Sequence, residues 1–165
     1  VVAGDGPDAS RVRAAAGANV EFTGELPRTE LRERMRGARA FLFAAEEDFG
    51  IVPLGAQACG TPVIAYARGG ALETIVEREG ASKTIPGDAI ALPVEELRLR
   101  QATGAFFHEQ TASAIAAAVR AFEADPPIDA AACRRNAERF SRQQFHRAFS
   151  DFAGLNAAVN TSAPA

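Results

Sequence analysis

The chain has 165 residues, of which 47% are hydrophobic and 24% are charged, and its formal net charge is −3. This length suits one domain with its own core, and the absence of a basic surplus argues against a nucleic-acid-binding protein. No apolar run reaches the roughly 18 residues of a membrane-spanning helix, and no signal-peptide pattern opens the chain. The two cysteines lack metal-ligand spacing, which favours free thiols and a cytoplasmic protein.

Segments typical of strands and helices alternate from the first residue onward. The β-branched run 1–3 ends at a Gly-Asp-Gly-Pro turn, and a helix over 8–16 is followed by a half-buried strand over 19–23. Thr29 is placed to cap the next helix. The unbroken apolar run 40–44 then predicts a strand that is buried on both faces.

The alternation continues through the middle of the chain. A short helix is expected between Pro53 and Gly60, then a buried strand over 62–65, then a helix that Gly69-Gly70 opens and that runs to about Val76. Repeated strand–helix units favour a parallel sheet. The sequence therefore predicts an α/β fold, a Rossmann-like parallel sheet with helices on both faces.

The remainder of the chain divides into an irregular part and a helical part. Residues 79–102 show no period and form an irregular insertion in a domain that spans 1–155, whereas 156–165 form a polar tail. Two helix starts are predicted in the C-terminal segment: Asp129 caps one helix, and Ser141 with Gln144 forms a capping box for the next. Along that last helix, three phenylalanines form one apolar stripe: Phe145, Phe149 and Phe152.

Unusual polar residues follow two of the predicted strands. Glu46, Glu47 and Asp48 come directly after the apolar run 40–44, and Gly69-Gly70 stands at the next helix start. In open parallel sheets, ligands bind beyond the carboxyl ends of the strands, at helix N-termini. A solvated acidic loop and an ordinary glycine turn remain the alternative interpretations of these residues.

Both segments lie within a longer pattern that resembles the C-terminal donor-binding domain of GT-B-fold retaining glycosyltransferases of family 4. The resemblance covers nearly the whole chain apart from the irregular insertion, and its residues keep the order and spacing of the family. The matching stretches are Val2 to Pro7, Phe22 to Gly24, Glu46 to Leu54, Ala56 to Ala65, Gly69 to Thr74 and Gly104 to Thr111.

The resemblance implies specific roles at the donor site. Glu47 would face the donor sugar, the backbone N–H groups of Phe49, Gly50 and Ile51 would bind sugar hydroxyls, and Val52 would lie near the diphosphate. Gly69 and Gly70 complete the donor-side set, and no metal ion is implied. Gly55 occupies the position where the family carries a second glutamate that binds the ribose, so that contact is missing here.

The implied function is transfer of a hexose from a nucleoside diphosphate sugar to an unknown saccharide, lipid or small-molecule acceptor, with retention. No other cofactor is expected, and GDP-mannose is the favoured donor, as in mannosyltransferases. The first βα unit and an N-terminal acceptor domain are expected outside this chain, which would be inactive alone; the missing domain is also a route to membrane association. The alternatives are a non-catalytic nucleotide-sugar-binding or interaction domain and a UDP-sugar epimerase-like protein.

Overall fold

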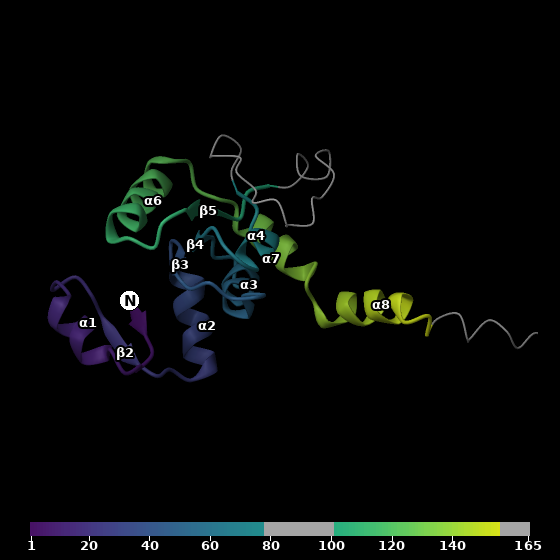
Figure 1. Ribbon diagram of the computed structural model, residues 1–165, viewed down its shortest axis with the longest axis horizontal. Coiled ribbons are helices and arrows are strands. Elements are labelled where there is room, and N and C mark those ends of the chain that lie inside the picture. Colours follow the sequence, from purple (N-terminus) through teal and green to yellow (C-terminus); the bar gives the residue numbers. More distant parts are fainter. Residues whose placement is uncertain (78–100, 156–165) are drawn as a thin grey trace, which may run out of the picture.

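The computed structural model describes residues 1–77 and 101–155. Strands and helices alternate as the sequence predicts through residue 74, whereas the strand at 104–107 was not predicted (Figure 1). Labelled as in Figure 1, the elements of the first half are β1 (Val2–Ala3), α1 (Ala9–Ala15), β2 (Phe22–Gly24), α2 (Arg28–Gly37), β3 (Phe41–Phe43) and α3 (Ile51–Ala58). The second half comprises β4 (Val63–Tyr66), α4 (Ala71–Thr74), β5 (Gly104–Phe107), α6 (Ala112–Ala124), α7 (Ala130–Glu138) and α8 (Arg142–Phe152). The predicted α/β class is confirmed. Domain limits that depend on 79–102 or 156–165 lie partly outside the described residues.

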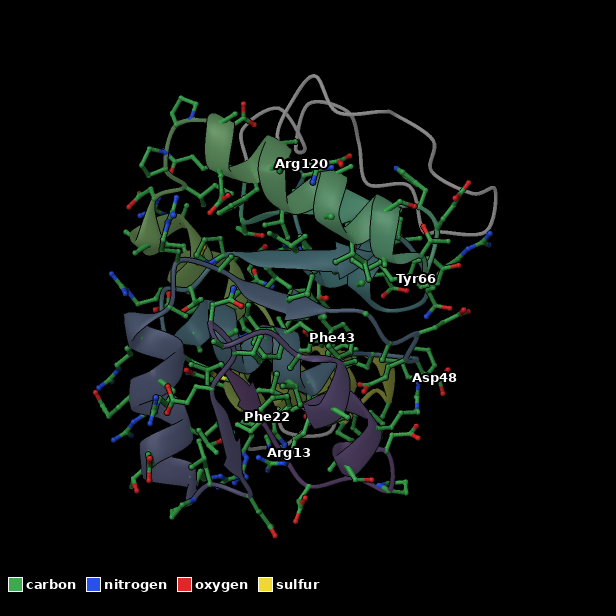
Figure 2. The ribbon with its side chains drawn as sticks, turned by 90° about the vertical axis from the view of Figure 1, so that its left-hand side faces the viewer. Arg13, Phe22, Phe43, Asp48, Tyr66 and Arg120 are labelled. Atoms are coloured by element: carbon green, nitrogen blue, oxygen red, sulfur yellow. The ribbon has the colours of Figure 1, made fainter. Side chains whose placement is uncertain are left out.

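The strands pair in parallel, but in two groups. β3, β4 and β5 form one sheet in that order, and β1 pairs with β2 in another. In both views the β1–β2 pair lies beyond β3, on the side away from β5 (Figures 1 and 2). Doubly wound folds usually have the strand order 3-2-1-4-5-6. In this order β2, β1, β3, β4 and β5 correspond to strands 3, 2, 4, 5 and 6, and no described strand occupies the position between β1 and β3.

The core lies on one face of the three-stranded sheet. Val63 and Ala65 of β4 are fully buried and pack with Phe43 of β3 against the helices that precede and follow these strands. The other members of this cluster are Met35, Ala56, Ala71 and Ile75. Burying a large apolar side chain contributes about 1.5–3 kcal/mol, so this cluster holds the two strands and their helices together.

The prediction that 40–44 is buried on both faces is wrong. Successive side chains of a strand point to opposite faces, and while Phe43 is buried, Leu42 on the opposite face is 47% exposed. Leu42 borders a hollow of about 190 Å³ between the sheet and α6, because that helix covers its face of the sheet incompletely. The lining residues are Arg39, Ala40, Leu42, Ile64, Val119, Phe122 and Glu123.

Two predicted helix ends also differ. α2 begins at Arg28 with Pro27 before it and no side-chain cap, so the predicted cap at Thr29 is wrong. α4 has one turn and does not reach Val76, because the chain is already extended at Ile75 and then bridges to β5. That bridge half-buries Glu77, and desolvation raises the pKa of its carboxyl group, against the lowering effects of the Phe106 backbone and His108.

The predicted caps at Asp129 and Ser141 are confirmed, but the capping box is only half formed, because the N–H of Ser141 donates to the carbonyl of Glu138 and not to the Gln144 side chain. Asp129 accepts a hydrogen bond from the backbone N–H of Ala131 (2.9 Å), which lowers the pKa of its carboxyl group, and Ser141 accepts one from Gln144 (3.4 Å). α8 extends away from the body of the domain (Figure 1). The phenylalanine stripe therefore exists, but as an exposed face, and Phe152 is 90% exposed. Within the described ranges, none of the helices is long and apolar enough to span a bilayer.

The two cysteines differ in environment and provide a check of the packing. Both are free thiols; Cys133 is fully buried and Cys59 is partly exposed. Burial, with Asp129 nearby, raises the pKa of the Cys133 thiol to about 11, so little reactive thiolate forms at pH 8.

We expect a disulfide reagent to titrate one thiol of the folded protein, which Cys59→Ser would remove and Cys133→Ser would leave. Rapid titration of both thiols without denaturant would contradict the packing of α7.

Candidate functional site

The candidate site lies at the carboxyl end of the three-stranded sheet. Because β3 and β4 are parallel, the loops that follow them emerge at the same edge. Figure 2 shows Asp48, from the loop after β3, and Tyr66, at the end of β4, at this same end of the molecule. The loop after β3 is anchored further by Gln110, whose amide donates to the carbonyl of Ala44 (2.7 Å). The structure thus brings together the two segments that the sequence selected.

The acidic residues of the first loop face solvent. Glu46, Glu47 and Asp48 are exposed, and none of the ion pairs between described residues uses them. Three carboxylates that form no ion pair with described residues are available as acceptors for a hydroxyl-rich ligand. Among residues 1–77 and 101–155, no three His, Cys, Asp or Glu side chains converge as metal ligands would.

The second loop packs directly on the backbone of the first. The N–H of Gly70 donates to the carbonyl of Glu47 at 2.8 Å. A Cβ atom on Gly69 would lie 2.3 Å from that carbonyl oxygen, and one on Gly70 would lie 2.4 Å from the Cα of Phe49. Only glycines permit this approach, so their role in the structure is to join the two loops; their predicted contact with a ligand stays a prediction.

The start of α3 offers backbone donors at the same edge. Gly50 adopts a left-handed conformation (φ 78°, ψ 60°) that turns the chain into the helix, and it provides no side-chain cap. The N–H groups of a helix's first turn have no partner within the helix. Those of Ile51 and Val52 therefore remain available, with the positive end of the helix dipole behind them, whereas Pro53 has none.

Gly55 lies on an exposed face of α3. It follows Ile51 by four residues and Val52 by three, so the three positions share one side of the helix. Ile51 is 74% exposed and Val52 is also exposed, although both are large and apolar. A Cβ atom at Gly55 would have no other atom within 4 Å. This position therefore has room for a larger side chain directed away from the core.

Two contacts that shape the site were not predicted from the sequence. Phe49 packs edge-on against Phe140, with ring centroids 5.9 Å apart, so the end of α7 supports the first loop. Gln57 and Asn136 are buried and hydrogen-bonded to each other (2.7 Å) behind the second loop. The only local signal was a glutamine at an apolar helix position, and nothing near Asn136 marked it. His108 and His146 are exposed.

Taken together, the edge combines exposed carboxylates, uncapped backbone donors and an apolar helix face. Such a surface can bind hydroxyl groups and an anionic group of one ligand at the same time. The fold defines a doubly wound α/β domain, and this edge is its candidate ligand site, beyond the ends of the strands.

Comparisons with known proteins identify the family. Residues 1–140 match the family described as "Glycosyl transferases group 1", and the chain therefore belongs to that family. No protein of curated function matches the sequence significantly. Among solved structures, the fold is similar to sucrose-phosphate synthase from Thermosynechococcus elongatus, with a TM-score of 0.61 and 25% sequence identity over 94% of this chain. The chain covers 37% of that protein's length.

The glycine contact between the loops gives a direct test of the site's construction. The backbone angle at Gly70 (φ −62°) suits alanine, so the clash of the new Cβ atom with Phe49 is the main effect of Gly70→Ala on stability. We expect this clash to lower the free energy of unfolding by about 1–3 kcal/mol. Gly55→Ala is the matched control; it meets no atom and is expected to gain about 0.5–1 kcal/mol from helix propensity. Urea unfolding measures both, and equal effects would show that the loops do not touch.

Proposed function

We propose that this chain is the donor-binding domain of a retaining glycosyltransferase that transfers a hexose from a nucleoside diphosphate sugar to an acceptor. The observation that carries the proposal is the direct backbone contact between the Glu47 and Gly70 loops beside the uncapped start of α3. This contact places the acidic loop, the paired glycines and the helix start at one edge, in a chain that belongs to the group 1 glycosyl transferases.

Each group at the edge has a role in this proposal. The Glu47 carboxylate accepts hydrogen bonds from sugar hydroxyls, and the N–H groups of Phe49, Gly50 and Ile51 donate to them. Val52, at the positive end of α3, lies near the diphosphate, where the helix dipole favours negative charge. Gly69-Gly70 hold the loop that carries Glu47 and lie beside the donor.

In the proposed reaction the protein contributes mainly by positioning the donor and by stabilising negative charge. In a retaining transfer, the leaving diphosphate assists removal of the acceptor's proton, and the domain fixes the donor and stabilises the charge that develops on the diphosphate. A hexose donor agrees with the mannosyltransferase-like pattern, for which GDP-mannose is the first candidate. It also agrees with the neighbour's name, since sucrose is built from two hexoses. The acceptor belongs to a second domain in this proposal.

One observation favours a second candidate function. Gly55 offers no side chain to a ribose, although there is room for one. A domain that binds a nucleotide sugar without transferring it, or an interaction domain, would tolerate that loss. A UDP-sugar epimerase-like protein is a further alternative. Turnover separates the three, because only the transferase moves the sugar to a second molecule.

The proposal is tested on the full natural protein that contains this chain. A panel of nucleoside diphosphate sugars, with GDP-mannose included, is compared with the bare nucleoside diphosphates by thermal shift and titration calorimetry. We expect at least one sugar nucleotide to raise the melting temperature more than its parent diphosphate does. No binding of any member of the panel would overturn the proposal, and sugar nucleotide binding without transfer to any acceptor would favour the second candidate.

Glu47→Ala sharpens this test. Because Glu47 is assigned to the sugar alone, we expect the variant to lose about 1.5–3 kcal/mol of sugar-nucleotide binding and to bind the bare diphosphate unchanged. The neighbouring and equally exposed carboxylate gives a matched control, Glu46→Ala, which should leave both affinities unchanged. Equal losses for the two ligands in Glu47→Ala would remove Glu47 from the sugar role.

Gly55→Glu tests the missing ribose contact. The new side chain meets no protein atom at its Cβ, and its carboxylate would accept hydrogen bonds from the ribose hydroxyls. We expect nucleoside diphosphate binding to tighten about tenfold, or ~1.4 kcal/mol, within the range of one charged hydrogen bond. Gly55→Ala separates this gain from the effect of helix propensity. Unchanged or weaker nucleotide binding, with the fold intact, would show that position 55 does not face the ribose.

A further inference from the structure

A buried hydrogen-bond network joins three helices behind the candidate site. The carbonyl of Thr74, the last residue of α4, accepts from the side-chain amides of Gln57 in α3 (2.9 Å) and Asn136 in α7 (2.8 Å). Asn136 also donates to Gln57 (2.7 Å) and accepts from Arg139 (2.8 Å). Gln57 and Thr74 are fully buried, and Asn136 is 6% exposed. Networks that are satisfied in this way fix one arrangement of the helices around them.

The network continues to the acidic loop. The Thr74 hydroxyl donates to the carbonyl of Gly70 (2.8 Å), and the N–H of Gly70 donates to the carbonyl of Glu47 (2.8 Å). A continuous chain of hydrogen bonds therefore runs from α7 through α4 to the backbone of Glu47. Arg139, one turn beyond Asn136, lies over the ring of Phe140, which itself packs on Phe49.

The short α4 needs this support. It has one turn (Ala71–Thr74), and a single turn is unstable by itself because nucleating a helix fixes several residues for one hydrogen bond. Its last carbonyl is held by Gln57 and Asn136, and its start is held by the Glu47 loop. Whatever moves Thr74 therefore moves Gly70, and with it the loop that carries Glu47.

We propose that Asn136, supported by Gln57, is a positioning residue that sets the 46–50 loop for the donor sugar through Thr74 and Gly70. This inference rests on the proposed function, because the loop's ligand is the sugar of a nucleoside diphosphate sugar. Asn136 does not touch the ligand; it acts through the hydrogen-bonded turn between α7 and the loop.

The test compares Asn136→Leu with the wild type in the full natural protein. The first readout needs no ligand: amide hydrogen exchange should rise at Gly70 and Thr74, whose N–H groups donate to the carbonyls of Glu47 and Gly70. The second readout is the ratio of the dissociation constants of a bare nucleoside diphosphate and its sugar nucleotide, which we expect to fall about tenfold. This ratio is independent of stability, because a smaller folded fraction weakens both apparent affinities equally.

Thr61→Val is the matched control. Thr61 is buried and its hydroxyl donates to the carbonyl of Met35, but it precedes β4, at the end of the sheet opposite the site. This variant should lose stability and leave both the exchange at Gly70 and Thr74 and the affinity ratio unchanged. If Asn136→Leu does not fold, Gln57→Met removes the companion amide at nearly the same volume and is measured in its place.

Two outcomes would overturn the inference: unchanged exchange at Gly70 and Thr74, or an unchanged affinity ratio despite increased exchange. A wild-type protein that binds no sugar nucleotide would instead defeat the proposed function. In that case the exchange comparison with Thr61→Val alone would decide whether Asn136 controls the loop.

Discussion

The site depends on one backbone contact, the hydrogen bond from the Gly70 N–H to the Glu47 carbonyl. The two loops can come this close only because the second carries no side chain at the contact, where Gly69 and Gly70 face the backbone of Glu47 and Phe49. The contact joins two separate connections into one edge. The exposed carboxylates of the first loop and the helix start that follows it gain fixed positions from it.

Polar side chains hold the second loop of the site in place, whereas apolar side chains of the core hold the strands from which both loops begin. Val63, Ala65 and Phe43 pack the strands against their helices, which fixes where the loops begin. Gln57 and Asn136 then hold the end of α4, which fixes where the second loop lies. Buried polar groups are costly unless they are paired, and every buried side-chain polar atom among the described residues has a partner. Such a site suits a ligand that is recognised through hydrogen bonds to protein groups in defined positions.

Gly55 is the position of the candidate site that departs from the glycosyltransferase pattern that the sequence resembles. The surrounding helix keeps its exposed apolar face, with Ile51 and Val52 beside the vacant position. The backbone at Gly55 is ordinary helix, so no backbone conformation requires a glycine there. Gly50 and Gly69 differ, because their positive φ angles favour glycine. The consequence is local: the acidic loop and the helix start keep their geometry, and only the contribution of one side chain is absent.

The sequence by itself determined the order of elements as far as α4, the caps at Asp129 and Ser141, and the two segments that meet at the site, but not the strand β5. These features depend on periods and turn residues that lie within a few positions of each other. The tertiary structure decided the exposed face of Leu42, the single turn of α4, the contact between Glu47 and Gly70, and the network of Asn136. Those features join residues more than twenty positions apart, or depend on which neighbouring helix covers a strand. Local propensity contains no information about either, because only packing brings such residues within hydrogen-bonding distance.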